Sequence, residues 1–581
     1  MKLPGLDDLL RRIPLSNKIP GIAGEKVLLE LDLGRGISET SPTNPLEALR
    51  ALRTPQLRTL VSHLRKAETD DSVVGLIGIL HGGGLTLSQA DELRAAVRSF
   101  RASGKPAYAF SPAFGELGEG NVGYHLATAF EQIWLQPASS LGLVGFTASG
   151  TFFKGTLDKL GLEPQFGQRH EYKSAADTFM RTSFTEANRE MTTRLVESIT
   201  EQVVAAVAAD RSLSSEDVRD AMSQAPLTPE EALDRNLIDH IGHRDEAYEA
   251  LRSRIGVAEP TLRYVERQGV SRFGGILEQL PKPGSSPRVA IIEAVGPISV
   301  GHASPGPGGH SIGSDSLGAA LRAAAKDKDV KAVVLRIDSP GGSAVASDAI
   351  RRDILQLRAA GKPVVASMAS VAASGGYYIA MPCDHIVASA GTLTGSIGVL
   401  AGKFVVREAL DKLGIGHELI AGSPRAAMLS GVAPFSKDEW AVLDAWLDRI
   451  YDDFTTKAAS DRSMPVDDLR AVARGRVWTG ADALSHGLVD QLGGMGDALD
   501  KACSLIGASR TDVQAVPYPK PHPLAAFSPP ESSESVGVSA LSVEGPMLWQ
   551  TLMTGLTQLT GWRPAGVLSL PPLRLPGVLP R

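Results

Sequence analysis

Two residues of this 581-residue chain could together hydrolyse an acyl bond by nucleophilic catalysis. Ser396 lies in the segment TGSIG between Gly395 and Gly398, and Lys173 lies in the segment YKSA. A serine hydroxyl becomes a strong nucleophile only when a neighbouring base removes its proton. Lysine can be that base if burial lowers its pKa towards neutrality. The pair therefore predicts a serine hydrolase with a dry, apolar site.

A glycine-rich turn could complete such a site. The segment DSPGG runs from Asp338 to Gly342 and follows an apolar run that ends at Ile337. Backbone N–H groups of Gly341 and Gly342 could point at the negative oxygen that develops during acyl transfer, and one such donor lowers the barrier by about 3–4 kcal/mol. The turn is thus a candidate oxyanion hole.

Each of these residues also has a purely structural interpretation. A serine between glycines is usually a turn or helix-cap residue, a lone lysine is usually solvated, and DSPGG is typical of a strand-to-helix turn. TGSIG also differs from the G-x-S-x-G elbow, because Thr394 replaces its first glycine. By themselves, the spacings indicate an α/β enzyme of undecided chemistry.

The chain contains an internal duplication. LDKLG begins at positions 157 and 410, which are 253 residues apart. DRSLSSEDVRDAM at 210 corresponds to DRSMPVDDLRAVA at 461, NLIDHIG at 236 to GLVDQLG at 487, and SGKPAYAF at 103 to AGKPVVAS at 360. The matches keep their order while the offset drifts by a few residues, as short loop insertions would make it drift. Two copies of one fold are therefore expected.

Each copy alternates strands and helices. Apolar runs such as VVGLIGIL (73–80) and KAVVLRI (331–337) indicate buried parallel strands, and each precedes a glycine-rich turn, a helical stretch and a second apolar strand. This pattern predicts the α/β class with largely parallel sheets. We expect an N-terminal tail at 1–24, a first repeat at 25–280, a linker at 281–288, a second repeat at 289–511 and a proline- and serine-rich tail at 512–581.

The two copies are not chemically equivalent. At the 253-residue offset, Leu143 of the first copy corresponds to Ser396 of the second, and Ala426 of the second corresponds to Lys173 of the first. One copy has retained a hydroxyl and the other an amine. The first repeat is therefore expected to contribute the lysine base, and the second the serine nucleophile and the oxyanion turn. Whether the two meet within one chain or between subunits stays open.

Composition excludes some classes of function. Hydrophobic residues make up 43% of the chain and charged residues 21%, and the formal net charge is −6, so a nucleic-acid partner is not expected. Cys383 and Cys503 form neither a disulfide framework nor a zinc site. Acidic and basic residues between positions 7 and 12 interrupt the N-terminal apolar run, so neither a signal peptide nor a transmembrane anchor is expected.

From about Val27 to Gly507, the sequence resembles the long, duplicated form of the bacterial signal peptide peptidase (protease IV) family. The segments that carry the resemblance are EYKSAADTFMR, LRIDSPGGSA, ASMASVAASGGYYIA, LTGSIGV and RVWTGADALSHGLVD, in the order of the family. The resemblance implies a Clp-protease/crotonase-like fold in each half. It also implies that Ser396 is the nucleophile, Lys173 its base, and Gly341 and Gly342 the oxyanion hole.

The function implied by the resemblance is a serine endopeptidase that hydrolyses apolar peptides, such as cleaved signal peptides, through an acyl-enzyme. No metal or organic cofactor is implied. The resemblance further implies a bacterial source and a homo-oligomer, with a tetramer as the expected size.

Long-form relatives usually begin with a transmembrane anchor, which is not evident in this sequence. The uncharged segment PMLWQTLMTGLTQLTGW (546–562) has apolar residues at near-helical spacing: Leu548, Trp549, Leu552, Met553, Leu556 and Leu559. It is a candidate for peripheral membrane contact, or for a helix that packs against another subunit. A cytoplasmic or peripherally membrane-associated protein is expected.

Two alternatives belong to other classes. A crotonase-like acyl-CoA enzyme would use a similar glycine turn, and a non-catalytic, membrane-associated scaffold could retain the fold alone. Acyl-CoA turnover without peptidase activity would favour the first alternative. Intact candidate residues at positions 173 and 396 argue against the second.

Overall fold

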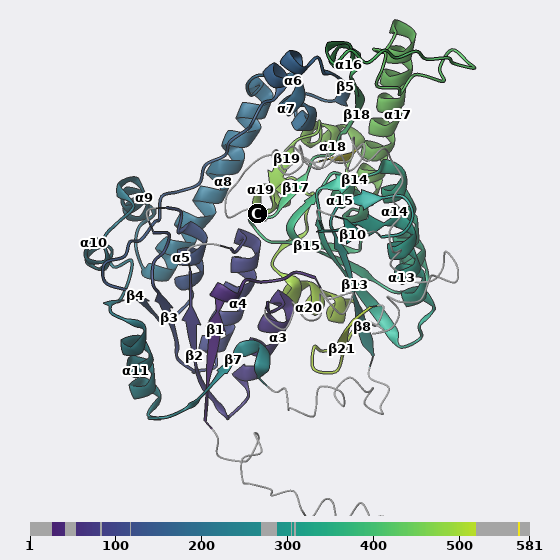
Figure 1. The fold of residues 1–581 in the computed structure, drawn as a ribbon. Helices are drawn as coiled ribbons and strands as arrows, with labels where there is room; N and C mark the ends of the chain where they lie inside the picture. Colours follow the sequence, from purple (N-terminus) through teal and green to yellow (C-terminus); the bar gives the residue numbers. More distant parts are fainter. Residues whose placement is uncertain are drawn as a thin grey trace, which may run out of the picture.

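The structure is a computed structural model that describes residues 26–40, 54–81, 84–116, 118–268, 287–303, 305–306, 309–518 and 568–569. In these residues, two α/β units each contain a largely parallel sheet; in Figure 1 the first unit runs from purple through blue to teal, and the second from teal through green to yellow-green. The predicted α/β class and duplication are confirmed. Most of the expected linker, and the apolar C-terminal segment 546–562, lie outside the described residues.

The first sheet is parallel throughout its described strands, in the order β6-β4-β3-β2-β1-β7. Its strands are β1 (Val27–Asp32), β2 (Val73–Ile79), β3 (Ala107–Ser111), β4 (Gln132–Leu135), β6 (His240–Ile241) and β7 (Thr261–Tyr264). The β1–β4 runs are rich in buried aliphatic and aromatic residues because helices cover both faces of the sheet.

The helices of this unit follow the strands along the chain. They are α3 (Leu57–Glu68), α4 (Leu87–Ala102), α5 (Asn121–Ala127), α6 (Lys154–Leu160), α7 (Asp177–Met180), α8 (Glu186–Arg211), α9 (Ser215–Gln224), α10 (Pro229–Asp234) and α11 (Arg244–Ile255). Reciprocal hydrogen bonds cap the N-termini of several helices. At the start of α4, the Thr86 hydroxyl accepts the N–H of Gln89, and the Gln89 side chain accepts the N–H of Thr86.

The second sheet has the path β19-β17-β15-β13-β8-β21, and β16 branches from β15 to β20. Its strands are β8 (Arg288–Val295), β13 (Val330–Ser339), β15 (Val364–Ala373), β16 (His385–Ala388), β17 (Leu393–Gly395), β19 (Val477–Thr479), β20 (Gln491–Leu492) and β21 (Gln514–Pro517). The β17–β19 pair is antiparallel, and the other described pairs in this sheet are parallel.

The helices of the second unit repeat the plan of the first. They are α13 (Ser314–Lys326), α14 (Ala344–Ala359), α15 (Gly375–Ala380), α16 (Arg407–Lys412), α17 (Lys437–Asp461), α18 (Val466–Val472), α19 (Gly480–Ser485) and α20 (Met495–Leu505). Short strands beside the main sheet are β9 (Ile298–Ser299), β12 (Ile312–Gly313) and β14 (Gly341–Gly342). They lie at the carboxyl end of β8 and β13, where β14 pairs with β9.

Hydrogen bonds between distant residues confirm the repeat at atomic detail. The Tyr124 hydroxyl donates to the Leu237 carbonyl, and Tyr377 donates in the same way to Leu488. The Lys105 ammonium donates to two carbonyls at the end of α3, and Lys362 does so at the end of α13. Since these are tertiary contacts, the two units share packing as well as element order.

One two-stranded ribbon joins the units. Strand β5 (Glu163–Arg169) of the first unit pairs antiparallel with β18 (Val399–Val405) of the second, from Val399 opposite Arg169 to Val405 opposite Glu163. The pairing lies near the top of the view in Figure 1, between α6 and α17. It carries a segment of the first unit into the second.

A buried charge cluster also lies between the units. The Arg336 guanidinium contacts the carboxylates of Glu92 at 2.7 Å and Glu39 at 3.1 Å. Arg336 and Glu92 are buried, the Glu39 side chain is 13% exposed, and burial raises the pKa of the Glu92 carboxyl while Arg336 opposes that rise. Because one cation contacts two anions from the other unit, the cluster orients the units relative to one another.

Candidate active site

The ribbon between the units delivers Lys173 to the second sheet. Strand β5 ends at Arg169, opposite the first residue of β18, Val399. The chain then turns, with the N–H of Lys173 donating to the carbonyl of His170. Antiparallel pairing places the residues after β5 beside those before β18, which include Ser396. Lys173 and Ser396 thus meet within one chain, although 223 positions separate them.

A second serine, Ser374, occupies the same place. Ser374 follows β15 and Ser396 follows β17, and these neighbouring strands pair in parallel with Ala373 opposite Gly395. The N–H of Ser374 donates to the carbonyl of Gly395 at 2.7 Å. The carboxyl ends of neighbouring parallel strands lie at one edge of a sheet. The two serines are therefore adjacent because their strands are.

The Lys173 amine contacts both serines. Its Nζ lies 2.8 Å from Ser374 Oγ, 2.9 Å from Ser396 Oγ and 2.8 Å from the Ser396 carbonyl oxygen. All three side chains are fully buried, with relative exposures of 0%. Burial alone lowers the pKa of Lys173 well below the ordinary value of a lysine. The geometry favours a neutral amine.

A neutral amine has two N–H donors and one lone pair. The Ser396 carbonyl can only accept, so it takes one N–H. The second N–H and the lone pair are left for the two hydroxyls. One hydroxyl therefore accepts from the amine, and the other donates its proton to it. The site accommodates one activated serine at a time.

Backbone geometry distinguishes the two serines. Ser374 connects β15 to α15 at φ 58° and ψ −114°, a conformation that costs a non-glycine residue of order 1–3 kcal/mol. A sharp strand-to-helix turn of this kind presents a nucleophilic serine in α/β-hydrolases. Ser396 also has a positive φ, 51°, but it follows β17, which pairs with β15 on one side and β19 on the other, and its N–H donates to the Arg476 carbonyl.

Ser374 is the serine beside the glycine turn. A Cβ on its neighbour Gly375 would lie 3.0 Å from the backbone nitrogen of Gly342 and 3.1 Å from Cα of Gly341. Gly376 is as closely packed, since a Cβ there would lie 2.6 Å from the Ser339 carbonyl. The predicted oxyanion turn thus lies against the segment that begins with Ser374.

Ser374 lies in the segment VAASGGYY and was not among the catalytic residues predicted from the sequence. A comparison of the two repeats distinguishes Ser374 from its counterpart in the first repeat. Tyr377 and Tyr124 make equivalent hydrogen bonds at the 253-residue offset, and the same offset aligns Ser374 with Asn121. Asn121 bonds both backbone groups of Gly145 and contacts no lysine amine in the described bonds. The first repeat therefore lacks a serine at both positions.

Two glycines permit the close approach of the lysine segment. A Cβ at Gly398 would lie 2.5 Å from the Arg169 carbonyl, and a Cβ at Gly475 would lie 2.6 Å from both Cβ and the backbone nitrogen of Lys173. Any larger side chain at either position would displace the lysine.

We expect Gly475→Ala to displace Lys173 and to lower kcat about 100-fold, because small misplacements of a catalytic group cost that much. Gly507→Ala is the matched control: Gly507 also has a positive φ, 68° against 83° for Gly475, but a Cβ there would meet nothing within 4 Å. The control should lose about 1–2 kcal/mol of stability and keep its kcat. Equal kcat values in the two purified variants would contradict the packing argument.

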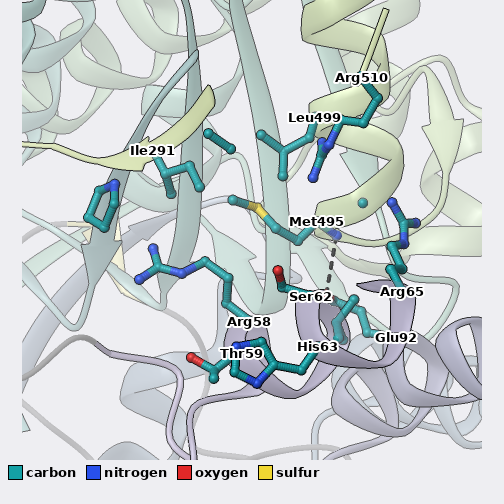
Figure 2. A pocket seen from close by; sticks show the side chains of 14 residues that line it. Arg58, Thr59, Ser62, His63, Arg65, Glu92, Ile291, Met495, Leu499 and Arg510 are labelled. Atoms are coloured by element: carbon teal, nitrogen blue, oxygen red, sulfur yellow. Dashed lines mark hydrogen bonds between the residues drawn. The ribbon is translucent and has the colours of Figure 1, made fainter. Parts of the chain in front are cut away.

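A cavity of about 180 Å³ lies elsewhere, between α3, α20 and the strands β8 and β21. Figure 2 shows Arg58, Arg65 and Arg510 around it, and the N–H of Met495 donating to the Glu92 carboxylate. Neither serine nor Lys173 lines this cavity. It marks the contact between the units, and the three arginines there have ion-pair partners.

No helix in the described ranges is both long enough and apolar enough to cross a membrane.

Comparison with known proteins identifies a peptidase family. Residues 99–258 and 356–509 match peptidase family S49. The chain is 36% identical over 455 residues to the chloroplastic serine protease SPPA of Arabidopsis thaliana, covering 77% of this chain and 65% of that protein. It is 33% identical over 463 residues to protease 4 of Salmonella typhi, covering 78% and 72%.

A putative signal peptide peptidase SppA of Enterococcus faecium is 34% identical over 180 residues, which is 31% of this chain and 52% of that protein. The matches leave about a third of the chloroplast relative's length uncovered. The two matched regions fall in the two structural repeats. The chain belongs to peptidase family S49, the serine peptidases that include protease 4.

Proposed function

We propose that this chain is a serine endopeptidase in which Ser374 attacks the peptide carbonyl and Lys173 is the general base. The observation that carries the proposal is the fully buried Lys173 amine, 2.8 Å from a serine hydroxyl at a strained strand-to-helix turn beside the glycine turn. Ser396, which the sequence analysis favoured as the nucleophile, takes a different role. It holds the amine through its hydroxyl and its carbonyl.

The reaction follows from these positions. Neutral Lys173 takes the proton of Ser374 as the hydroxyl oxygen attacks the carbonyl carbon. Backbone N–H groups of the Gly341–Gly342 turn stabilise the oxyanion. The Lys173 ammonium then gives its proton to the leaving amine, and the acyl group stays on Ser374. Water, deprotonated by the same lysine, hydrolyses the acyl-enzyme and restores the free serine.

An extended peptide suits the edge beside the turn. Strand β14, formed by Gly341 and Gly342, pairs antiparallel with the backbone of β22 (Leu568–Ser569) from the C-terminal region of the chain. Addition of a strand to an exposed edge is a common mode of peptide recognition. A substrate backbone that paired in this way would lie across the oxyanion turn. This pairing favours a peptide over an acyl-CoA thioester.

The substrates proposed for this chain are apolar peptides, including cleaved signal peptides. The name of the Enterococcus faecium relative supports this class. The residues beside the two serines in the chain, among them Ala372, Ala373 and Ile397, are small or apolar and buried, so the surroundings of the site disfavour a charged group. Peripheral contact with a membrane, where such peptides occur, forms part of the proposal.

The test is cleavage of fluorogenic peptides by the full chain. We expect an apolar, signal-peptide-like sequence to be cleaved with a kcat/KM at least about 10-fold above that for a matched peptide with two acidic residues at its centre, since a buried unpaired charge costs more than 1.4 kcal/mol. Acyl-CoA thioesters serve as the second substrate. Thioester turnover without peptide cleavage would favour the crotonase-like alternative, and turnover of neither would favour a scaffold.

A further inference from the structure

Arg476 lies between the segment that carries Lys173 and the segment that carries Ser396. Its carbonyl accepts the N–H of Ser396 at 2.6 Å, at the end of the antiparallel β17–β19 pair. The residue before it, Gly475, donates its N–H to the carbonyl of Ile397 at 2.7 Å. The same glycine lies against Lys173, since a Cβ there would be 2.6 Å from the backbone nitrogen of the lysine. This short stretch of backbone therefore contacts both the base and the serine that holds it.

The Arg476 side chain also reaches the lysine segment. Its guanidinium carbon lies 4.8 Å from the ring centroid of Tyr172, which immediately precedes Lys173, and 4.4 Å from that of Trp478. A cation over a ring face is attracted by the electron density of the ring, and the planar guanidinium of arginine suits this contact. Trp478 is itself fixed, because its indole N–H donates to the Val472 carbonyl at 2.8 Å. Tyr172 and Trp478 belong to different repeats, so one guanidinium links the lysine segment to the second unit.

An ion pair fixes the plane of this guanidinium. Both carboxylate oxygens of Glu190, on α8 of the first unit, accept from Arg476 at 2.7 Å. The Arg476 side chain is 14% exposed and that of Glu190 51%, so the pair adds little to stability, but its bidentate geometry sets the orientation of the fork. Hydrogen bonds from Arg476 and from Tyr172 hold the pKa of the Glu190 carboxyl below its ordinary value. The glutamate therefore stays charged and keeps the guanidinium over the tyrosine ring.

We infer that Arg476 is a positioning residue for the general base. Through Tyr172 it fixes the chain next to Lys173, and through its carbonyl it fixes Ser396, so it sets the place of the amine relative to the serines. It acts through these groups and not on the substrate, and this role rests on the proposed function of Lys173. Loosening the link would move the amine and admit water to it. Since burial is what lowers the pKa of Lys173, water would bring that pKa back towards its ordinary value.

The activity test replaces Arg476 by methionine, which fills similar space without the charge or the planar fork. We expect kcat for the apolar peptide to fall about 100-fold through misplacement of the base, with KM little changed. The acid limb of kcat/KM should move to higher pH, because the loosened amine is easier to protonate. Arg474→Met is the matched control and should keep both kcat and the limb: Arg474 also pairs with a glutamate at 2.7 Å, but its side chain is 53% exposed. An unmoved acid limb in Arg476→Met would contradict the inference even if kcat fell.

Two variants of Tyr172 test the same link while the arginine stays in place. Tyr172→Leu removes the ring and Tyr172→Phe keeps its face, so kcat of the phenylalanine variant should be at least about 10-fold above that of the leucine variant. Tyr172→Leu combined with Arg476→Met should lose no more activity than Arg476→Met alone, because the two side chains act as one unit. Fully additive losses would show that the two residues act independently, and would overturn the inference.

Chemical labelling of Lys173 gives a readout that does not use peptidase activity. Acetic anhydride at about pH 10 acetylates accessible neutral amines, and mass spectrometry of the digested chain measures the rate at residue 173. The buried amine should react slowly in the wild type and at least about 10-fold faster in Arg476→Met, because local opening exposes it.

Lys403, which is 8% exposed and donates to the Met428 carbonyl, is the internal control and should stay slow. Equal acceleration at both lysines would indicate general loosening of the fold, and no acceleration at Lys173 would show that Arg476 does not hold it; either result would overturn the inference. A wild type that cleaves no peptide but shows the expected labelling would contradict the proposed function and leave the positioning role in place.

Discussion

Replacing Ser374 by alanine is expected to abolish peptide cleavage, with kcat falling by about 10⁴-fold or more, because loss of a nucleophile removes the acyl-enzyme route. The Lys173 amine would keep its two contacts with Ser396, so the variant should stay folded. Steady-state cleavage of an apolar fluorogenic peptide measures the loss, and circular dichroism checks the fold.

Ser396→Ala is the matched comparison for this prediction. It removes one hydroxyl contact of Lys173 and leaves the Ser374 contact in place. We expect kcat to fall about 100-fold through misplacement of the amine. Loss of a hydrogen-bond acceptor also destabilises the ammonium form, so the acid limb of the kcat/KM profile should move to lower pH.

The position of the acyl group on the chain shows directly which of the two serines is the nucleophile. A slowly hydrolysed active ester should leave its acyl group on the proteolytic fragment that contains residue 374, which mass spectrometry identifies. Acylation at 396, together with the larger loss in Ser396→Ala, would exchange the roles of the two serines. Equal activity of both variants and wild type would exclude both serines as the nucleophile.

Replacing Lys173 by methionine should remove activity and raise stability at the same time. The base contributes about 10²–10⁴ in rate, so kcat should fall within or beyond that range. Burial of an amine without a carboxylate partner costs free energy, whereas methionine fills the same space without that cost. The free energy of unfolding in urea should therefore be higher for the variant at neutral pH.

The pH dependence of this stability difference has a defined sign. Burial lowers the pKa of Lys173 in the folded protein, while the unfolded chain titrates near the ordinary value of about 10.4. Between these values the unfolded chain binds one more proton, so wild-type stability rises with pH. The contribution of Lys173 is complete above about pH 10.4 and is lost as pH falls through the lowered pKa. The advantage of Lys173→Met should shrink from pH 7 to pH 9, and an advantage that grows with pH would contradict this.

Activity should follow the same ionisation. Only the neutral amine accepts the Ser374 proton, so kcat/KM should fall on the acid side as Lys173 becomes charged. Burial, aided by Glu39, also raises the pKa of Asp338 in the glycine turn to about 7, so Asp338 could titrate in the same range. Asp338→Asn provides the control, since its oxygen can still accept the N–H of Val371. Persistence of the acid limb in that variant assigns the limb to Lys173.

The sequence determined a large part of the architecture. Matched segments in the same order at a nearly constant offset established the duplication, because short insertions shift the spacing of two copies but leave the order of their segments unchanged. Strand and turn patterns gave the α/β class. The loss of the serine at Leu143 and of the lysine at Ala426 indicated that each repeat supplies one part of a site, before any distance was available.

Only the tertiary structure decided how the site is composed. Ser374 and Ser396 are 22 positions apart, and their contact depends on β15 and β17 being neighbours in register. Lys173 reaches them because β5 leaves its own unit to pair with β18. Local sequence specifies neither pairing, since strand partners are selected by packing across the whole core.

The ability of Lys173 to act as a base also depends on the tertiary structure. Its sequence neighbourhood, Tyr172 and Ser174, contains nothing that would make it a base. Its lowered pKa comes from complete burial, to which both repeats contribute. Desolvation is a property of the folded interior, and a positive φ at Ser374 is a property of the folded backbone. The sequence therefore predicted which residue types would meet, and the fold brought two serine hydroxyls within hydrogen-bond distance of the buried amine.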